Sequence, residues 1–101
     1  MRMLVFFDLP VETNEDRRNY RNFRKTLIKS GFLMLQESVY CKLLTTPQVE
    51  ASVTNTILLN KPPRGVVQTL VVTEKQFAKM KFIVGERTTD VIDSEERLVI
   101  L

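Results

Sequence analysis

The amino-acid sequence predicts an α+β fold in which one antiparallel sheet carries both of its main helices on a single face. Three features predict it: two continuous apolar runs rich in strand-forming residues, an amphipathic segment with helix-capping residues between them, and the order of the elements. The 101 residues suffice for one domain and are too few for two, so we expect a single domain over 1–101.

The composition is that of an ordinary globular chain and excludes several kinds of chemistry. Hydrophobic residues make up 44% and charged residues 27%, which argues against a disordered or fibrous protein. There is no histidine, so Ser-His and Cys-His nucleophile pairs and His-containing zinc sites are excluded. Cys41 is the only cysteine, and no apolar run approaches the roughly 18 to 20 residues that cross a bilayer. We therefore expect a cytoplasmic protein with no internal disulfide and no membrane span.

The first strand and the first helix are the clearest elements. Met3–Phe7 is a continuous apolar run closed by Asp8, which is typical of a buried central strand. Thr13 and Asp16 have the spacing of a capping box, and a glycine supplies a stop, so we predict a helix over 14–30.

The middle of the chain predicts short strands and a second helix. The stretches 32–35 and 38–44 are apolar or alternating, and fit either one bent strand or two strands in a hairpin. Thr46 and Pro47 are a good N-cap and first-turn pair for a second helix, whose apolar residues recur every four positions until Pro62.

The last part of the chain returns to strand patterns. Val66–Val72 is apolar enough to be buried, and we place it beside the first strand. Thr73 and Gln76 form another capping box, which predicts a short helical turn. We expect a brief strand over 82–84, followed by a C-terminal loop and terminal strand over 85–101.

This order of elements, βαββαβ, is that of ferredoxin-like domains, which have one antiparallel sheet with both helices on the same face. The other face of such a sheet needs cover. Because Val66–Val72 is so apolar, we expect that face to pack against a second copy of the chain.

The first predicted helix carries the strongest functional signal. Between positions 17 and 29 there are six basic residues and no acidic one, and they share one arc of the helix, opposite Tyr20, Phe23 and Leu27. A solvated helix face is the simple alternative, but mixed signs are usual there, and six charges of one sign favour a phosphate-binding surface. The candidate nucleic-acid-binding residues are Arg17, Arg18, Arg21, Arg24, Lys25 and Lys29.

Asp8 is the candidate catalytic and metal-binding residue. It follows the first apolar run directly, although from position alone it fits a turn residue before Leu9 and Pro10 better. If Asp8 lies near a two-fold axis, its symmetry mate brings a second carboxylate, and a divalent cation would relieve the repulsion. Oxygen ligands favour Mg²⁺ or Mn²⁺, which polarises a phosphodiester and activates water.

Weaker candidates lie at strand edges and in one loop. Gln36, Ser38 and Tyr40 are in positions from which a phosphate can be reached, although polar residues at strand edges are more often simply solvated. The loop 61–64 is stiff and basic, and fits a spacer between elements equally well.

Three segments, FFDLP, RRNYRNFRKTLIKSGF and QESVYCKLL, resemble the CRISPR-associated protein two family. The stretches TEKQF and SEERLVIL resemble the branch of that family found in type II systems, which use a single large RNA-guided nuclease. The resemblance covers nearly the whole chain. It implies a ferredoxin-like homodimer in which the final strand, here about Leu98–Leu101, is added to the sheet of the partner subunit.

The resemblance also implies a function in CRISPR adaptation, the acquisition of spacers. The family's dimer bridges two dimers of the CRISPR integrase and holds the double-stranded DNA prespacer by its backbone. Some members cleave RNA or DNA with Mg²⁺ through the aspartate that matches Asp8, and the arginines that match Arg17 and Arg18 are implicated. The leading interpretation is thus a scaffold that binds duplex DNA, and the alternative is a metal-dependent endonuclease or endoribonuclease. A small-molecule-sensing regulatory domain would explain the fold but leave the basic helix without a role.

Overall fold

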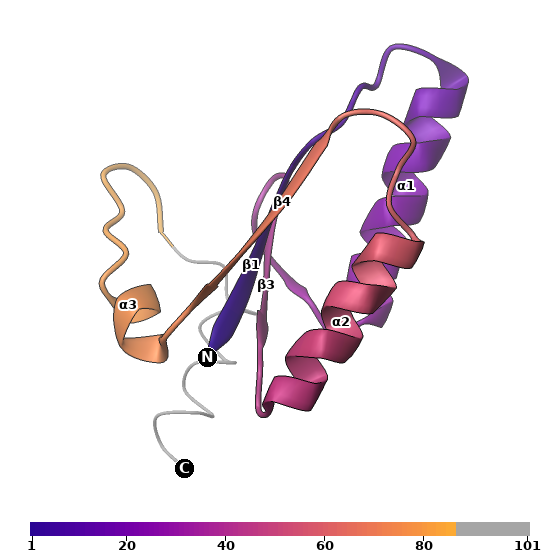
Figure 1. Ribbon diagram of the computed structural model, residues 1–101. Helices are drawn as coiled ribbons and strands as arrows, with labels where there is room; N and C mark the ends of the chain where they lie inside the picture. Colours follow the sequence, from indigo (N-terminus) through magenta and orange to yellow (C-terminus); the bar gives the residue numbers. More distant parts are fainter. Residues whose placement is uncertain (87–101) are drawn as a thin grey trace.

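The computed structural model describes residues 1–86, in which one four-stranded sheet separates two long helices from a short third helix (Figure 1). The elements follow the predicted order up to the last strand. They are β1 (Arg2–Asp8), α1 (Asn14–Lys29), β2 (Leu33–Gln36), β3 (Val39–Leu43), α2 (Pro47–Leu59), β4 (Val66–Val72) and α3 (Glu74–Ala78).

β1 lies at the centre of the sheet, as its continuous apolar run predicted. The strand order is β2-β3-β1-β4, and every neighbouring pair is antiparallel. Val5 lies opposite Tyr40 of β3 and Thr69 of β4, and it is fully buried. Of the two arrangements open for the middle of the chain, the structure has the hairpin, with a β-bulge between Met34 and Gln36.

α1 begins and ends where its capping residues predicted. The Asp16 amide donates to the Thr13 hydroxyl at 3.0 Å, and the Thr13 amide donates back to the Asp16 carboxylate at 3.3 Å, so the capping box is complete. The last helical residue is Lys29, with Ser30 as the C-cap and Gly31 in the left-handed region at φ 92°. These ends fix which residues of α1 face the sheet.

The main core lies between the sheet and the two long helices. Phe7 is at its centre: its ring centroid lies 5.3 Å from that of Phe23, 5.8 Å from that of Tyr20 and 5.7 Å from that of Tyr40. Phe23 and Leu27 of α1 are buried there, as the helical spacing predicted.

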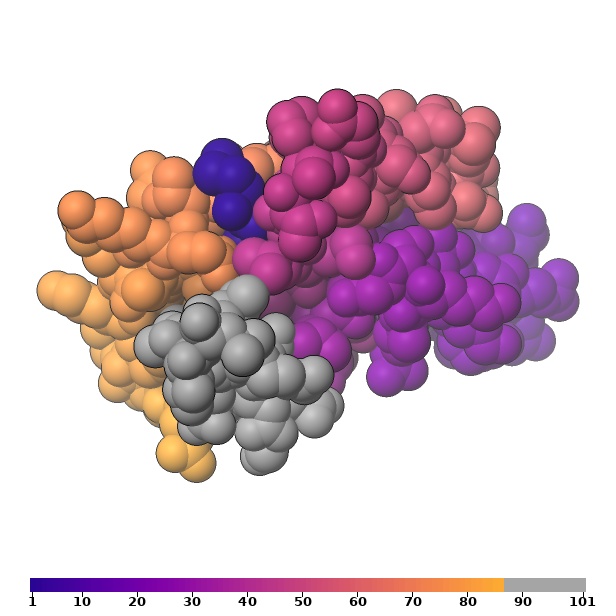
Figure 2. All heavy atoms as spheres, turned by 90° about the horizontal axis from the view of Figure 1, so that it is seen from below, coloured from indigo at the N-terminus to yellow at the C-terminus, as the bar shows by residue number. Residues whose placement is uncertain are grey.

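α3 covers part of the opposite face of the sheet. Its Phe77, 3% exposed, packs with Leu4 and Cys41, which point away from the two long helices. Arg2 is buried beneath α3, where its guanidinium pairs with the Glu74 carboxylate at 2.7 Å and lies 4.2 Å from the centroid of the Phe77 ring. α1 and α2 therefore share one face as predicted, while the short third helix lies on the other. Figure 2 shows the same division, with the orange segment that contains α3 far from the purple α1.

Two expectations for the C-terminal half were wrong. β4 is an edge strand, and in a single chain it is not buried: Val66 is 53% exposed and Leu70 is 52% exposed, because both lie on the face of the sheet opposite the two long helices, whereas Val67 and Val71 pack against the main core. No strand forms over 82–84, where Ile83 and Val84 are each 90% exposed and no described strand runs alongside to bond their backbone.

The rest of the predicted C-terminal loop, 87–97, and the predicted strand Leu98–Leu101 lie outside the described residues. Within residues 1–86, no helix combines the length and apolar character needed to span a bilayer.

Candidate nucleic-acid interface

The predicted basic residues of α1 form one exposed surface, which we call the α1 basic face. All of them are exposed, whereas Phe23 and Leu27 on the other side of the helix are buried. At 100° per residue they fall within an arc of about 140°, and they extend over about 18 Å of helix length. The α1 basic face consists of Arg17, Arg18, Arg21, Arg24, Lys25 and Lys29.

No carboxylate neutralises this face within residues 1–86. The salt bridges of that part of the chain join Arg2 to Glu74 and Arg64 to Asp16, and none includes a residue of the α1 basic face. The positive charge of the face is therefore available to an anion.

Two residues of the face also make hydrogen bonds within the chain. Arg17 donates to the carbonyl oxygens of Val11 at 2.9 Å and Glu12 at 3.1 Å, and to the Asn14 side chain. It thereby braces the loop that joins β1 to α1. The other four side chains of the face form no hydrogen bond with residues 1–86. They are Arg18, Arg21, Lys25 and Lys29.

The side chain of Arg24 is held in place by a residue of the sheet. Its Nε donates to the hydroxyl of Tyr40 at 2.9 Å, and this hydrogen bond raises the pKa of Arg24 above its ordinary value. Tyr40 is only 2% exposed, so it acts through Arg24 and does not itself reach the surface. The terminal nitrogens of Arg24 keep their donors for an external anion.

One of the two acidic residues in the first turn of α1, Asp16, pairs with an arginine from a distant loop. Arg64 donates to both oxygens of Asp16, at 2.8 and 3.0 Å, and so ties the start of α1 to the segment before β4. Burial raises the pKa of Asp16, but hydrogen bonds with Thr13 and the charge of Arg64 outweigh that effect and lower the pKa below its ordinary value. The basic loop 61–64 thus acts at least partly as a structural tie.

Asp8 lies exposed at the end of β1, beside a hollow of about 190 Å³. Two neighbours fix its backbone. The Phe7 amide donates to the carbonyl of Ser38 at 3.0 Å, and Gly65, at φ 98°, comes so close that a Cβ there would lie 2.7 Å from the Asp8 carbonyl oxygen. The residues that line the hollow are Phe6, Phe7, Asp8, Ser38, Val39, Val66 and Gln68.

The residues around Asp8 offer a divalent cation few protein ligands. No group of three carboxylate or thiol side chains with metal-binding proximity occurs in residues 1–86, so one copy of the chain offers the Asp8 carboxylate alone. Mg²⁺ is commonly held by one or two carboxylates, several waters and the phosphates of a substrate. Asp8 would therefore hold such an ion together with substrate or with a second copy of the chain.

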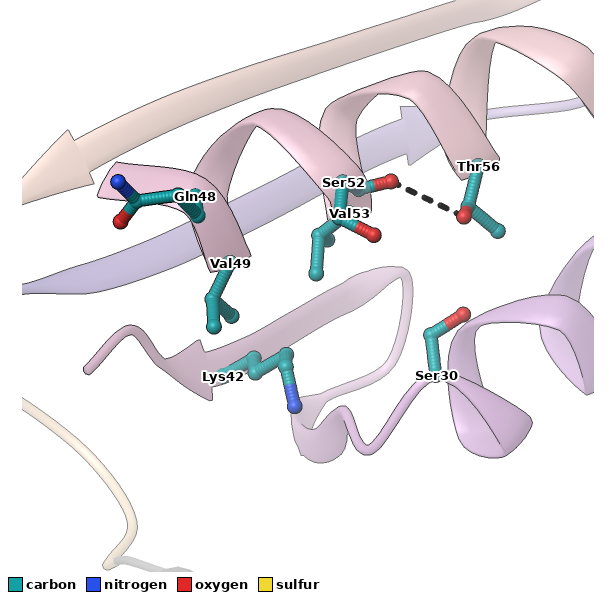
Figure 3. Close-up of a pocket in the computed structure, with 7 residues that line it drawn as sticks. All are labelled: Ser30, Lys42, Gln48, Val49, Ser52, Val53 and Thr56. Atoms are coloured by element: carbon teal, nitrogen blue, oxygen red, sulfur yellow. Dashed lines mark hydrogen bonds between the residues drawn. The ribbon is translucent and has the colours of Figure 1, made fainter. Parts of the chain in front are cut away.

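Another hollow, of about 400 Å³, lies between α2, β3 and the end of α1 (Figure 3). The side chain of Lys42, on β3, extends along the base of this hollow toward Ser30. Its Nζ lies so close to Gly31 that a Cβ added there would be 2.6 Å away. The Lys42 ammonium group therefore lies close to the residue that follows the C-cap of α1. The residues that line this hollow are Ser30, Lys42, Gln48, Val49, Ser52, Val53 and Thr56.

Comparison with known proteins decides the family. The sequence profile described as CRISPR associated protein Cas2 matches residues 1–80. The chain belongs to the Cas2 family. The resemblance drawn from the first strand, the arginine-rich helix and the following hairpin is thereby confirmed.

Relatives of this Cas2 protein match over its full length. A protein of Treponema denticola named "CRISPR-associated endoribonuclease Cas2" is 55% identical over 101 residues, covering the whole of both chains. A protein of Lacticaseibacillus rhamnosus with the same name is 48% identical, again over the whole of both chains. The crystal structure of Streptococcus pyogenes Cas2 at pH 6.5 matches with a TM-score of 0.66 and 18% identity, covering 83% of this chain and all of that one. That structural likeness shows the fold.

The structure relates the predicted site residues to one another in two ways. The loop that follows Asp8 is braced by Arg17, so the candidate catalytic residue and the α1 basic face share one short connection. Ser38 and Gln68, in contrast, come together with Asp8 from distant segments. Sequence reasoning grouped Ser38 with Gln36 and Tyr40 as weak phosphate contacts and did not connect it with Asp8. It missed Gln68, which the pairing of β1 with β4 would have placed.

Proposed function

We propose that this Cas2 protein is a subunit of CRISPR adaptation that binds the backbone of a prespacer duplex and, as a homodimer, bridges dimers of the CRISPR integrase. The observation that carries the proposal is the α1 basic face: six exposed basic side chains with no carboxylate partner within residues 1–86. Contacts to phosphates position a protein on a duplex without reading its sequence, which suits a subunit that accepts many different spacers.

The dimensions of the face fit a duplex. Its length of about 18 Å corresponds to about five base-pair steps at 3.4 Å per step. Guanidinium groups also match phosphate oxygens in a bidentate manner, and four of the six residues of the face are arginines: Arg17, Arg18, Arg21 and Arg24.

The open part of the sheet supports a dimer with ferredoxin-like subunits. The strand order β2-β3-β1-β4 with α1 and α2 on one face is the arrangement we expect for that fold. Leu70 leaves apolar surface exposed on β4, beyond the Asp8 hollow, which a second copy would cover. The free edge of β4 also offers a place for a strand added from the partner subunit, as proposed for Leu98–Leu101. Such a dimer would present the α1 basic face twice, in the cytoplasm where CRISPR arrays lie.

The salt dependence of duplex binding tests this function. Eight phosphate contacts in a dimer, four from each copy, predict that the logarithm of the binding constant falls with the logarithm of salt concentration with a slope of about −7. Fluorescence anisotropy with a labelled DNA duplex between 50 and 200 mM NaCl measures the slope, and the Asp8→Ala variant serves as a control that should keep it. An affinity that stays flat over this range contradicts the proposal.

A second candidate function is metal-dependent cleavage of phosphodiester bonds at Asp8. Two observations favour it: the relatives from T. denticola and L. rhamnosus are named endoribonucleases, and Asp8 is exposed beside a hollow at the end of the central strand. Bound Mg²⁺ or Mn²⁺ would polarise the phosphodiester and lower the pKa of an attacking water. Asp8 would hold the ion and orient it toward the phosphate.

For this second function, the Asp8→Ala variant should lose more than about 100-fold in the rate of cleavage of a single-stranded RNA in Mg²⁺, because it lacks the carboxylate ligand. Glu12→Ala is the matched control, since Glu12 is an exposed carboxylate in the next loop and should be neutral. Gel analysis of a labelled RNA over time gives the rates. Cleavage that continues in Asp8→Ala, or in EDTA, would eliminate Asp8 as the centre of the reaction.

A further inference from the structure

We infer that Ser38 and Gln68 are positioning residues of the Asp8 site, whose hydroxyl and carboxamide groups donate hydrogen bonds to the oxygens of one nucleic-acid phosphate and hold it beside the carboxylate. The inference rests on the Asp8 site of the second candidate function. It adds the part that binds the phosphate.

The strand register places Gln68 next to Asp8. Asp8 pairs with Val66 of β4, and Phe6 pairs with Gln68, so Gln68 is the diagonal neighbour of Asp8 on the same face of the sheet. Diagonal neighbours lie about 7 to 8 Å apart, within reach of a long side chain. Both residues line the hollow of about 190 Å³, which has room for a phosphate group.

Ser38 completes the hollow from the β2–β3 turn and has an unusual backbone. Its φ is 65°, and it is the single non-glycine residue with positive φ in residues 1–86. Glycine adopts this region without steric cost, so the turn by itself gives no reason for a serine. The Ser38 carbonyl accepts the Phe7 amide at 3.0 Å, which fixes the turn against the strand that carries Asp8.

The polar groups of these three side chains have no use inside the described chain. No hydrogen bond or ion pair joins the side chain of Asp8, Ser38 or Gln68 to another residue of 1–86. A carboxylate alone repels a phosphate, whereas a hydroxyl and an amide NH₂ group donate to its oxygens. The three together offer a cation ligand and phosphate donors in one hollow.

The test measures how much Mn²⁺ tightens the binding of a labelled 12-nucleotide single-stranded RNA relative to EDTA. We expect a clear gain for the wild-type protein, and a gain reduced about 10-fold by Ser38→Gly and by Gln68→Ala, since each removes a hydrogen bond to a charged group. The loss of affinity in EDTA should be much smaller, because without the cation the Asp8 carboxylate repels the phosphate and the α1 basic face supplies most of the binding. Ser38→Ala, which keeps a Cβ but removes the hydroxyl, should behave like Ser38→Gly.

Melting temperatures separate this role from a structural one. Ser38→Gly should keep or raise the Tm, because glycine fits φ 65° without strain, while the Mn²⁺ gain falls. Ser52→Ala and Gln48→Ala are matched controls on α2, outside the Asp8 hollow, and should retain the full gain.

Each outcome has a defined meaning. No Mn²⁺ gain in the wild type, or a full gain in both Ser38→Gly and Gln68→Ala, overturns the inference. If Asp8→Ala also keeps the Mn²⁺ gain, the proposed Asp8 site is wrong as well. If Asp8→Ala alone loses the gain, the Asp8 site stands, and the positioning roles of Ser38 and Gln68 are wrong. The duplex-binding function is judged separately by its salt slope, so its failure is distinguishable from that of the Asp8 hollow.

Discussion

Charge reversal at two positions of the α1 basic face, in the double variant R18E/R21E, should weaken duplex binding by the Cas2 protein at least about 100-fold. Neither side chain forms a hydrogen bond or ion pair within residues 1–86, so the change breaks no contact there. Each arginine lost removes a charge-assisted contact worth about 1.5 kcal/mol or more, and each glutamate adds repulsion toward the phosphates. Anisotropy with a DNA duplex at 100 mM NaCl measures the loss.

The control for this experiment is K79E/K81E, which changes the net charge by the same amount at two exposed lysines near α3. α3 lies across the sheet from α1 (Figure 1), so this variant should lose much less affinity. Equal losses in the two double variants would mean that net charge, and not the α1 basic face, governs binding.

The largest expected effect on stability comes from Glu74→Ala. The Arg2 side chain is 2% exposed, and the variant would leave its guanidinium buried without its carboxylate partner. Burial lowers the pKa of Arg2, but the hydrogen bond and charge of Glu74 outweigh it and raise the pKa above the ordinary value. Breaking a buried ion pair on one side costs 3 to 5 kcal/mol, and since Glu74 is 41% exposed we expect the lower end, about 3 kcal/mol.

Urea unfolding of the wild type and Glu74→Ala gives this difference in free energy. Glu37→Ala, at an exposed turn, is the matched carboxylate control and should change stability by less than about 0.5 kcal/mol. The double variant R2M/E74L should recover much of the loss, because apolar side chains leave no charge under α3. A cost for Glu74→Ala no larger than for Glu37→Ala would show that Arg2 does not depend on its partner.

Local signals made most of the fold predictable from the sequence. Thr13 with Asp16, and Thr73 with Gln76, form their capping boxes as predicted, because both partners of each bond lie within one turn. The exposure of β4 was not predictable, since an apolar run does not tell how many strands flank it or what covers its face. The hairpin could not be separated from a bent strand, because the pattern of 32–44 contains a bulge.

Some features of the candidate site were likewise predictable from the sequence, and others were not. The α1 basic face follows from helical periodicity, which depends on the sequence of one segment alone. The bond from Arg24 to Tyr40 and the tie from Arg64 to Asp16 depend on how distant elements pack, so nothing in the local pattern announced them. The same holds for the meeting of Ser38 and Gln68 beside Asp8.

The hydrogen bond between Arg24 and Tyr40 has a consequence for the rate and the affinity of the proposed binding to a phosphate backbone. A free arginine loses rotamer entropy when it closes on a phosphate, but here that freedom is already lost during folding. Arg24 is thus preorganised. A phenylalanine at position 40 would leave the charge of Arg24 intact, but the arginine would then have to find the right rotamer each time it meets a phosphate.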